Sequence, residues 1–145
     1  MTKVSMMRES LKKVVVPELR KSGFKGSFPH FRRPQDDHIE LLFIYLLKSG
    51  DGVRVETSIC SLDGYTTHWG EKIPPNKVKV DYMDPDKRYN IGEDKPEFVG
   101  GIIFFFEDLQ NEAEFDILSK EILNYLKLDE KNWIKNKVEK KLKKI

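Results

Sequence analysis

The sequence predicts an α+β fold, with an antiparallel β-sheet of about four to six strands, an N-terminal helix and two C-terminal helices packed on it. Apolar residues recur at three- and four-residue spacing at both ends of the chain, which is the periodicity of an amphipathic helix. Between these ends, short segments alternate apolar and polar residues or are apolar throughout, and turn-forming residues separate them, as in strands. The order of helix, strands and helices indicates helices against one face of the sheet.

The first helix is expected from about Ser5 to Ser22. Gly23 can end it in the left-handed conformation, and Phe24 can fold back as the hydrophobic contact of that cap. Pro17 lacks a backbone donor and clashes with the preceding turn, so it predicts a kink or a new first turn within the segment. The apolar face consists of Met7, Leu11, Val14, Val15 and Leu19.

Strands are expected in the middle of the chain. They are Phe28–Arg33, Ile39–Lys48, Val53–Leu62, Lys87–Ile91 and Val99–Glu107, with a short strand near Val78–Val80. The turn-forming residues Ser49–Gly52 join the second and third of these strands into a hairpin. Alternation along Val53–Leu62 predicts one buried and one solvated face.

Three consecutive phenylalanines, Phe104 to Phe106, place at least one large aromatic side chain on each face of the sheet. The strand Ile39–Lys48 is apolar at almost every position, as is normal for a strand covered on both sides. Monomers usually avoid exposed apolar patches unless something binds there. We therefore expect the second sheet face to be covered by the terminal helix, by the long segment after Leu62 or by a second copy of the chain.

That long segment, Asp63–Asp86, is the irregular part of the chain, because Gly and Pro residues interrupt it repeatedly. A connection of this length inside a compact domain is usually functional or poorly ordered. Tyr65, His68 and Trp69 cluster in it, and aromatic residues on loops are enriched at binding surfaces. In the alternative interpretation, Trp69 fills the edge of the core and anchors the segment.

The two C-terminal helices are expected at Asn111–Leu126 and at about Glu130–Lys144. Residues 129–145 contain seven lysines and three acidic residues, a net charge of +4, so the total of +2 leaves −2 for the rest of the chain. A nucleic-acid footprint should extend over the whole domain, and a membrane-surface helix needs a broader apolar face. We therefore expect a solvated basic helix, no specific nucleic-acid binding and no membrane contact.

Length and composition are those of a single globular domain, residues 1–145. A hydrophobic content of 39% argues against disorder. The single cysteine, Cys60, excludes an internal disulfide and fits a reducing compartment. The N-terminus lacks the apolar core of a signal peptide, and no segment has the length of a membrane span. A cytoplasmic location is therefore expected.

No metal site, cofactor site or catalytic residue is predicted. His30, His38 and His68 are eight and thirty residues apart, without the close pair that metal sites usually contain. The sequence also lacks a glycine-rich phosphate loop, a pair of Cys-x-x-Cys motifs, a His-Glu-x-x-His motif and a nucleophile elbow.

Three arginines on two predicted strands, Arg32, Arg33 and Arg88, are candidates for a ligand site. The planar guanidinium group suits carboxylate and phosphate, and the two strands could bring these groups to one sheet face. The alternative, which we favour, is an ion pair with Glu40 or Glu56 on neighbouring strands.

The segment from Val16 to Lys25, followed by Phe31-Arg32-Arg33, resembles the opening of the bacterial family known as "domain of unknown function 4304". Members have a helix that ends in a Pro-x-Leu-x-x-x-Gly-Phe-Lys pattern, followed by a Phe-x-Arg strand. The segment Arg88–Gly92 is similar to the family's Arg-x-Arg-Ile-Gly stretch, but Asn90 replaces the second arginine and the Trp-Trp pair that often follows is missing. The resemblance implies a small bacterial α+β domain and supplies no activity.

The leading functional hypothesis is a non-enzymatic module that binds another protein, as adaptor or immunity proteins do, through the Asp63–Asp86 segment and the exposed sheet face. A homodimer is an open alternative. The competing hypothesis is a small-ligand-binding protein or an enzyme that uses an arginine-lined pocket on the sheet. A deep pocket with converging guanidinium groups would favour the second hypothesis, and a flat aromatic surface the first.

Overall fold

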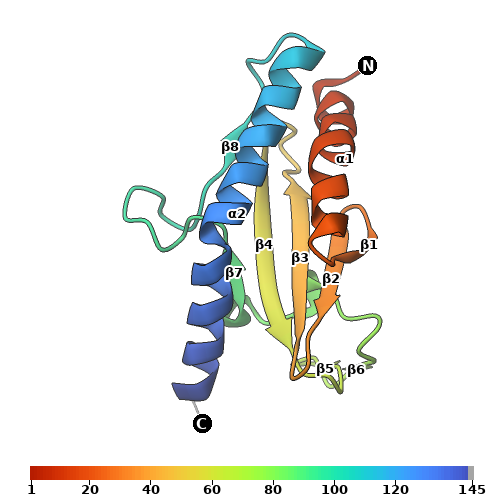
Figure 1. Ribbon diagram of the computed structural model, residues 1–145, viewed down its shortest axis with the longest axis vertical. Coiled ribbons are helices and arrows are strands. Elements are labelled where there is room, and N and C mark those ends of the chain that lie inside the picture. Colours follow the sequence, from red (N-terminus) through yellow and green to blue (C-terminus); the bar gives the residue numbers. More distant parts are fainter. Residues whose placement is uncertain (144–145) are drawn as a thin grey trace.

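The computed structural model describes residues 1–143, and the side chains of residues 1–130. Two helices lie side by side over one face of an antiparallel sheet (Figure 1). They are α1, Lys3–Lys21, and α2, Glu112–Lys143. The α+β class and the antiparallel sheet are confirmed, whereas the number of helices is smaller than predicted.

Both ends of α1 are capped by the residues that the sequence provides. The Thr2 hydroxyl accepts a hydrogen bond from the Ser5 amide at 3.1 Å. At the other end Gly23 has a φ of +96°, and the Phe24 amide donates to the Leu19 carbonyl at 3.0 Å, which is the predicted glycine cap. Of the two alternatives at Pro17, the new first turn is wrong, because α1 continues through this residue, and the kink stays a prediction.

The prediction of two C-terminal helices is wrong, because one helix, α2, spans both segments. No Gly or Pro lies between Leu126 and Glu130, so nothing in the backbone ends the helix there. Asp129 accepts hydrogen bonds from the Tyr89 hydroxyl at 2.8 Å and from the Gly92 amide at 2.9 Å. Its carboxylate therefore fastens α2 to the sheet. The side chains of the predicted basic face beyond Glu130 lie outside the described residues.

The main sheet has the strand order β1-β2-β3-β4-β7, and β8 also pairs with β4. These strands are β1 Lys25–Ser27, β2 His30–Pro34, β3 Ile39–Leu46, β4 Gly52–Cys60, β7 Arg88–Asn90 and β8 Phe104–Phe105. The predicted strand Val99–Glu107 is reduced to β8, because Gly100 and Gly101 adopt positive φ angles in a loop that leaves the sheet.

The first sheet face and the two helices enclose the main core. Phe31 on β2, Leu42 on β3 and Tyr89 on β7 lie in register on this face. They pack with helix residues that are almost completely buried, namely Met7, Leu11, Val15, Phe115 and Ile122. The helical periodicity in the sequence therefore indicated the correct face of α1.

Residues 61–87 fold across the second sheet face, at the lower end in Figure 1. They contain the hairpin β5 Tyr65–Thr66 and β6 Lys72–Ile73, and the short 3₁₀ helices η1 Val80–Tyr82 and η2 Pro85–Lys87. The predicted short strand near Val78–Val80 is wrong. A second apolar cluster joins this segment to β3 and β4 and consists of Ile39, Leu41, Cys60, Ile73, Val78, Val80 and Met83.

The segment covers only part of the second face. Leu41 is buried beneath it, but Ile103 and Phe105, towards the other end of the sheet, keep 39% and 55% of their surface exposed. The long segment therefore covers one half of the second face, and a second copy of the chain as the cover of the other half stays a prediction.

Candidate functional site

Arg33 is a structural residue of the first sheet face. Its guanidinium group donates to the Glu40 carboxylate at 2.7 Å and also to Glu130 on α2. It lies over the Phe24 ring, 4.4 Å from the centroid. Burial by itself would lower the pKa of Arg33, but the hydrogen bonds to Glu40 and Glu130 raise this pKa above its ordinary value. The favoured ion-pair alternative is correct for this arginine.

The structure does not bring the three predicted arginines together. Arg32 and Arg88 share the second face, in one row with Leu41 and Ser58, but three strand spacings, about 14 Å, separate them. Arg88 donates to the backbone carbonyls of Met83 at 2.9 Å and Asp81 at 3.0 Å, and so holds the turn around η1. Of the three, Arg32 alone lines a cavity described below.

Tyr65, His68 and Trp69 divide into an anchor and an exposed tip. Tyr65 packs against the second apolar cluster, and its hydroxyl accepts from the Asp84 amide at 3.3 Å. Trp69 is 56% exposed and donates to the Glu71 carboxylate at 3.0 Å, with the His68 ring edge-on at 4.9 Å. Tyr65 therefore anchors the segment, and the interpretation of Trp69 as a plug of the core is wrong.

Four apolar side chains on the uncovered half of the second face form what we call the open patch: Tyr45, Leu47, Ile103 and Phe105. Gly52 lies beneath three of them, and a Cβ atom there would come within 2.9 Å of Ile103, 3.2 Å of Leu47 and 3.4 Å of Phe105. Because glycine has no side chain, these three residues can pack directly on the backbone of β4 at Gly52. Ile103, Leu47 and Phe105 therefore form one apolar surface, in which Ile103 and Phe105 are 39% and 55% exposed.

An aromatic row continues from the open patch along β3 to β2. The rings of Tyr45 and Phe43 meet edge-on with centroids 5.3 Å apart. Phe43 in turn stacks on His30 at 4.3 Å, with an interplanar angle of 13°. Phe43 and Tyr45 also line a hollow of about 400 Å³, together with Arg8 and Lys12 of α1.

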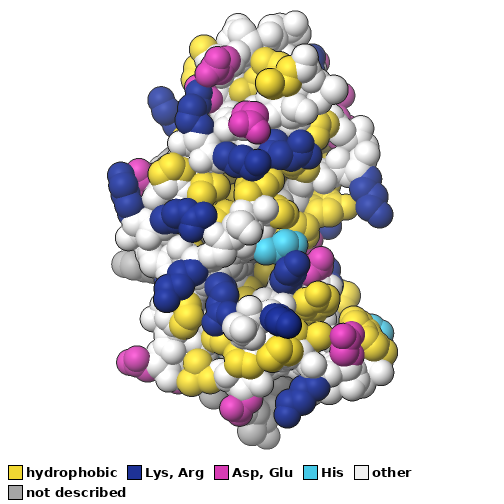
Figure 2. Space-filling model, turned by 90° about the vertical axis from the view of Figure 1, so that its right-hand side faces the viewer, with side chains coloured by type: hydrophobic (Ala, Val, Ile, Leu, Met, Phe, Trp, Pro, Cys, Tyr) yellow, Lys and Arg dark blue, Asp and Glu magenta, His cyan; other side chains and the backbone are white. Residues whose placement is uncertain are grey.

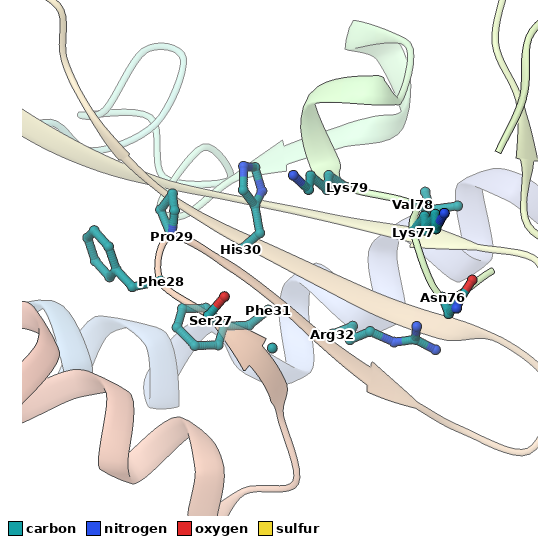
Figure 3. Close-up of a pocket in the computed structure, with 11 residues that line it drawn as sticks. Ser27, Phe28, Pro29, His30, Phe31, Arg32, Asn76, Lys77, Val78 and Lys79 are labelled. Carbon is teal, nitrogen blue, oxygen red and sulfur yellow. The ribbon is translucent and has the colours of Figure 1, made fainter. Parts of the chain in front are cut away.

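A basic groove begins at His30, between the β1–β2 hairpin and residues 76–79 (Figure 3). Its volume is about 270 Å³. Arg32, Lys77 and Lys79 line it, with the polar side chains of Ser27 and Asn76, and no acidic residue does. None of these three cations makes an ion pair with the residues that the structure describes. We call this cavity the basic groove.

The His30 imidazole lies at the inner edge of the basic groove. Its Nδ1 atom is buried, and within residues 1–130 it has no hydrogen-bond partner. Burial lowers the pKa of His30 below its ordinary value; Asp81 opposes this shift, and the nearby Lys79 adds to it. The imidazole is therefore mainly neutral at neutral pH.

The lowered pKa of His30 predicts a loss of stability on mild acidification. The unfolded chain takes up a proton near pH 6.5, whereas the folded chain takes it up only at lower pH, so the free energy of unfolding falls as the pH decreases through this window. Urea denaturation at about pH 7 and about pH 5 measures the loss. The loss of stability should be smaller in His30→Gln than in the wild type. In His68→Gln, whose imidazole is exposed, the loss should equal that of the wild type. Equal losses in the wild type and His30→Gln would contradict this assignment.

Sequence reasoning missed the basic groove and the open patch. Lys77 and Lys79 alternate with the buried Val78 and Val80, a pattern that predicts a strand. The alternation does place the lysines outward, but it does not indicate what they face. The pair Gly100–Gly101 marked a backbone irregularity and gave no sign that Phe105 would be exposed.

No family, no curated protein and no solved structure matches this chain. The resemblance to "domain of unknown function 4304" therefore stays a prediction. Neither helix of the described part of the chain is long and apolar enough to cross a bilayer. Within the same residues, no group of three His, Cys, Asp or Glu side chains is placed to hold a metal ion.

Proposed function

We propose that this protein is a binding module that recognises another protein through the open patch and the aromatic row beside it. The exposure of Phe105, 55% of its surface, is the observation that supports the proposal most directly. Contiguous exposed apolar side chains on a folded domain are typical of interaction sites, and aromatic residues are enriched where binding energy is concentrated. An adaptor or immunity role would suit a module of this kind.

The charges around the patch favour a partner with an acidic rim. Arg8 and Lys12 line the neighbouring hollow. Arg54 lies 5.0 Å from the Tyr45 ring centroid and is itself paired with Glu56 at 3.0 Å. Figure 2 views the side of the molecule that lies on the right in Figure 1, away from β8, and there too Lys and Arg side chains lie between and around hydrophobic ones. Complementary charge at the rim of an interface mainly accelerates and orients association, while the apolar centre supplies affinity.

Site-specific photo-crosslinking in the native cells tests this proposal. A benzophenone amino acid in place of Phe105 should give one discrete covalent adduct, because the ring would lie inside the interface. The matched control is the same amino acid at Ile117, which is 65% exposed on α2. An adduct with twice the mass of the chain would identify a second copy as the partner. Absence of a discrete adduct at Phe105, or the same adduct at both positions, would refute the proposal.

A further inference from the structure

We propose that the basic groove binds a phosphate monoester group. The inference goes beyond the proposed protein interface, because it concerns other residues and a small anionic ligand. It requires no contact with the open patch.

The charges of the groove favour a dianion. Arg32, Lys77 and Lys79 line one cavity, and the described residues that line it include no carboxylate. The mutual repulsion of these three cations is unfavourable until an anion enters. A phosphate monoester has close to two negative charges at neutral pH and three acceptor oxygens, which match one guanidinium and two ammonium groups. A carboxylate has one charge and two oxygens, and so satisfies the site less well.

The neutral groups of the groove complete this arrangement. In Figure 3, the Lys79 side chain extends towards His30, and Arg32 lies on the side of Asn76. Burial lowers the pKa of His30, Asp81 opposes this shift, and the positive charge of Lys79 adds to it. The imidazole is therefore neutral and can donate one hydrogen bond, as can the Ser27 hydroxyl and the Asn76 amide. The groove thus offers several donors around the three cations.

The walls of the groove are held in place before a ligand arrives. Gly26 has a φ of +109°, and a Cβ atom there would lie 2.7 Å from the His30 carbonyl oxygen, so the β1–β2 turn is tight. On the other wall, Val78 and Val80 keep only 5% and 1% of their surface exposed. Their burial fixes the backbone next to Lys77 and Lys79. Groups that are already positioned lose little conformational entropy on binding.

The size of the groove limits the ligand. About 270 Å³ accommodates a phosphate and part of an organic group, with Phe28, Pro29 and Val78 as apolar contacts. A nucleic-acid duplex would need a continuous basic stripe over many phosphates. The groove has three cations along one small cavity instead, so a small ligand with one phosphate group is what it fits.

Titration of the ¹⁵N-labelled protein with inorganic phosphate and with O-phosphoserine, at constant ionic strength of about 0.15 M, tests this proposal. Saturable NMR shifts are expected for the amides of residues 26–32 and 76–79. Arg32→Gln should weaken binding by about tenfold or more, because a charge-assisted hydrogen bond to phosphate is lost. Lys79→Gln should also weaken it, whereas Lys48→Gln, the same charge change in the exposed β3–β4 turn, should not.

Two further arms identify the source of the phosphate. Tighter binding of a capped phosphoserine peptide than of free O-phosphoserine would indicate that the ligand is a phosphorylated protein segment. Equal binding of the two would indicate that the ligand is a small phosphate compound. Shifts that do not saturate, or equal weakening by Lys48→Gln and Arg32→Gln, would overturn the proposal, as would tighter binding of an oligonucleotide. Crosslinking at Phe105 in the Arg32→Gln background separates the two proposals, since it should be unchanged.

Discussion

Arg33→Met is expected to lower the free energy of unfolding by about 3 to 5 kcal/mol, the range found when one partner of a buried ion pair is removed. Glu40, which accepts from Arg33 at 2.7 Å, is 2% exposed. Without the guanidinium group, its carboxylate stays buried, with the Gln35 amide at 3.0 Å and the His38 Nε2 atom at 3.8 Å as neighbours among the described residues. The same substitution breaks the link to Glu130 and so weakens the attachment of α2. Urea denaturation followed by circular dichroism measures the change.

The neighbouring arginine provides the matched control. Arg32 lies on the opposite sheet face and makes no ion pair with the described residues, so Arg32→Met should change the free energy of unfolding by no more than about 0.5 kcal/mol. Adding Glu40→Gln to Arg33→Met should recover part of the loss, because the unpaired buried charge is then removed. Similar losses for the two arginine variants would show that the ion pair is not the source of the effect.

Phe106→Ala is expected to destabilise the protein by about 3 to 5 kcal/mol, as truncation of a fully buried phenylalanine usually does. Phe106 has no exposed surface and contacts the Phe115 ring of α2 at a centroid distance of 6.1 Å. The cavity would open between the sheet and α2, where the backbone cannot close it. Thermal denaturation at fixed pH measures the loss.

The adjacent phenylalanine tests the assignment of faces. Phe105→Ala should cost no more than about 0.5 kcal/mol, because that side chain is largely exposed already. The two substitutions remove the same atoms from consecutive positions, and they differ only in the face on which the ring lies. A large loss in both variants would mean that the open patch is part of a core.

Local patterns in the sequence predicted those features that depend on short-range chemistry. Gly23 and Phe24 form the helix cap that their types suggested, and the Ser49–Gly52 turn joins β3 and β4. The alternation of side chains along a strand also places Arg32 and Arg33 on opposite faces of the sheet. A single arginine-lined pocket containing both could therefore have been rejected from the sequence.

Features that depend on long-range packing could not be predicted in this way. Glu56 and Ser58 alternate with apolar residues and were expected in solvent, yet they are 4% and 0% exposed. Residues 61–87 fold over this part of β4, and the Ser58 hydroxyl donates to the Lys87 carbonyl at 2.7 Å. The basic groove has the same origin, since Lys77 and Lys79 reach β2 only after this segment has folded back. No local pattern specifies that contact.

The apolar interior is divided into two clusters, and we expect the smaller cluster to open separately from the main core. The cluster beneath residues 61–87 is small and separate from the main core between the sheet and the helices. Its opening leaves that core intact and therefore requires less free energy than global unfolding. One wall of the basic groove belongs to this segment and the other to the β1–β2 hairpin. We therefore expect a ligand bound between these walls to stabilise the segment against local opening before it stabilises the rest of the protein.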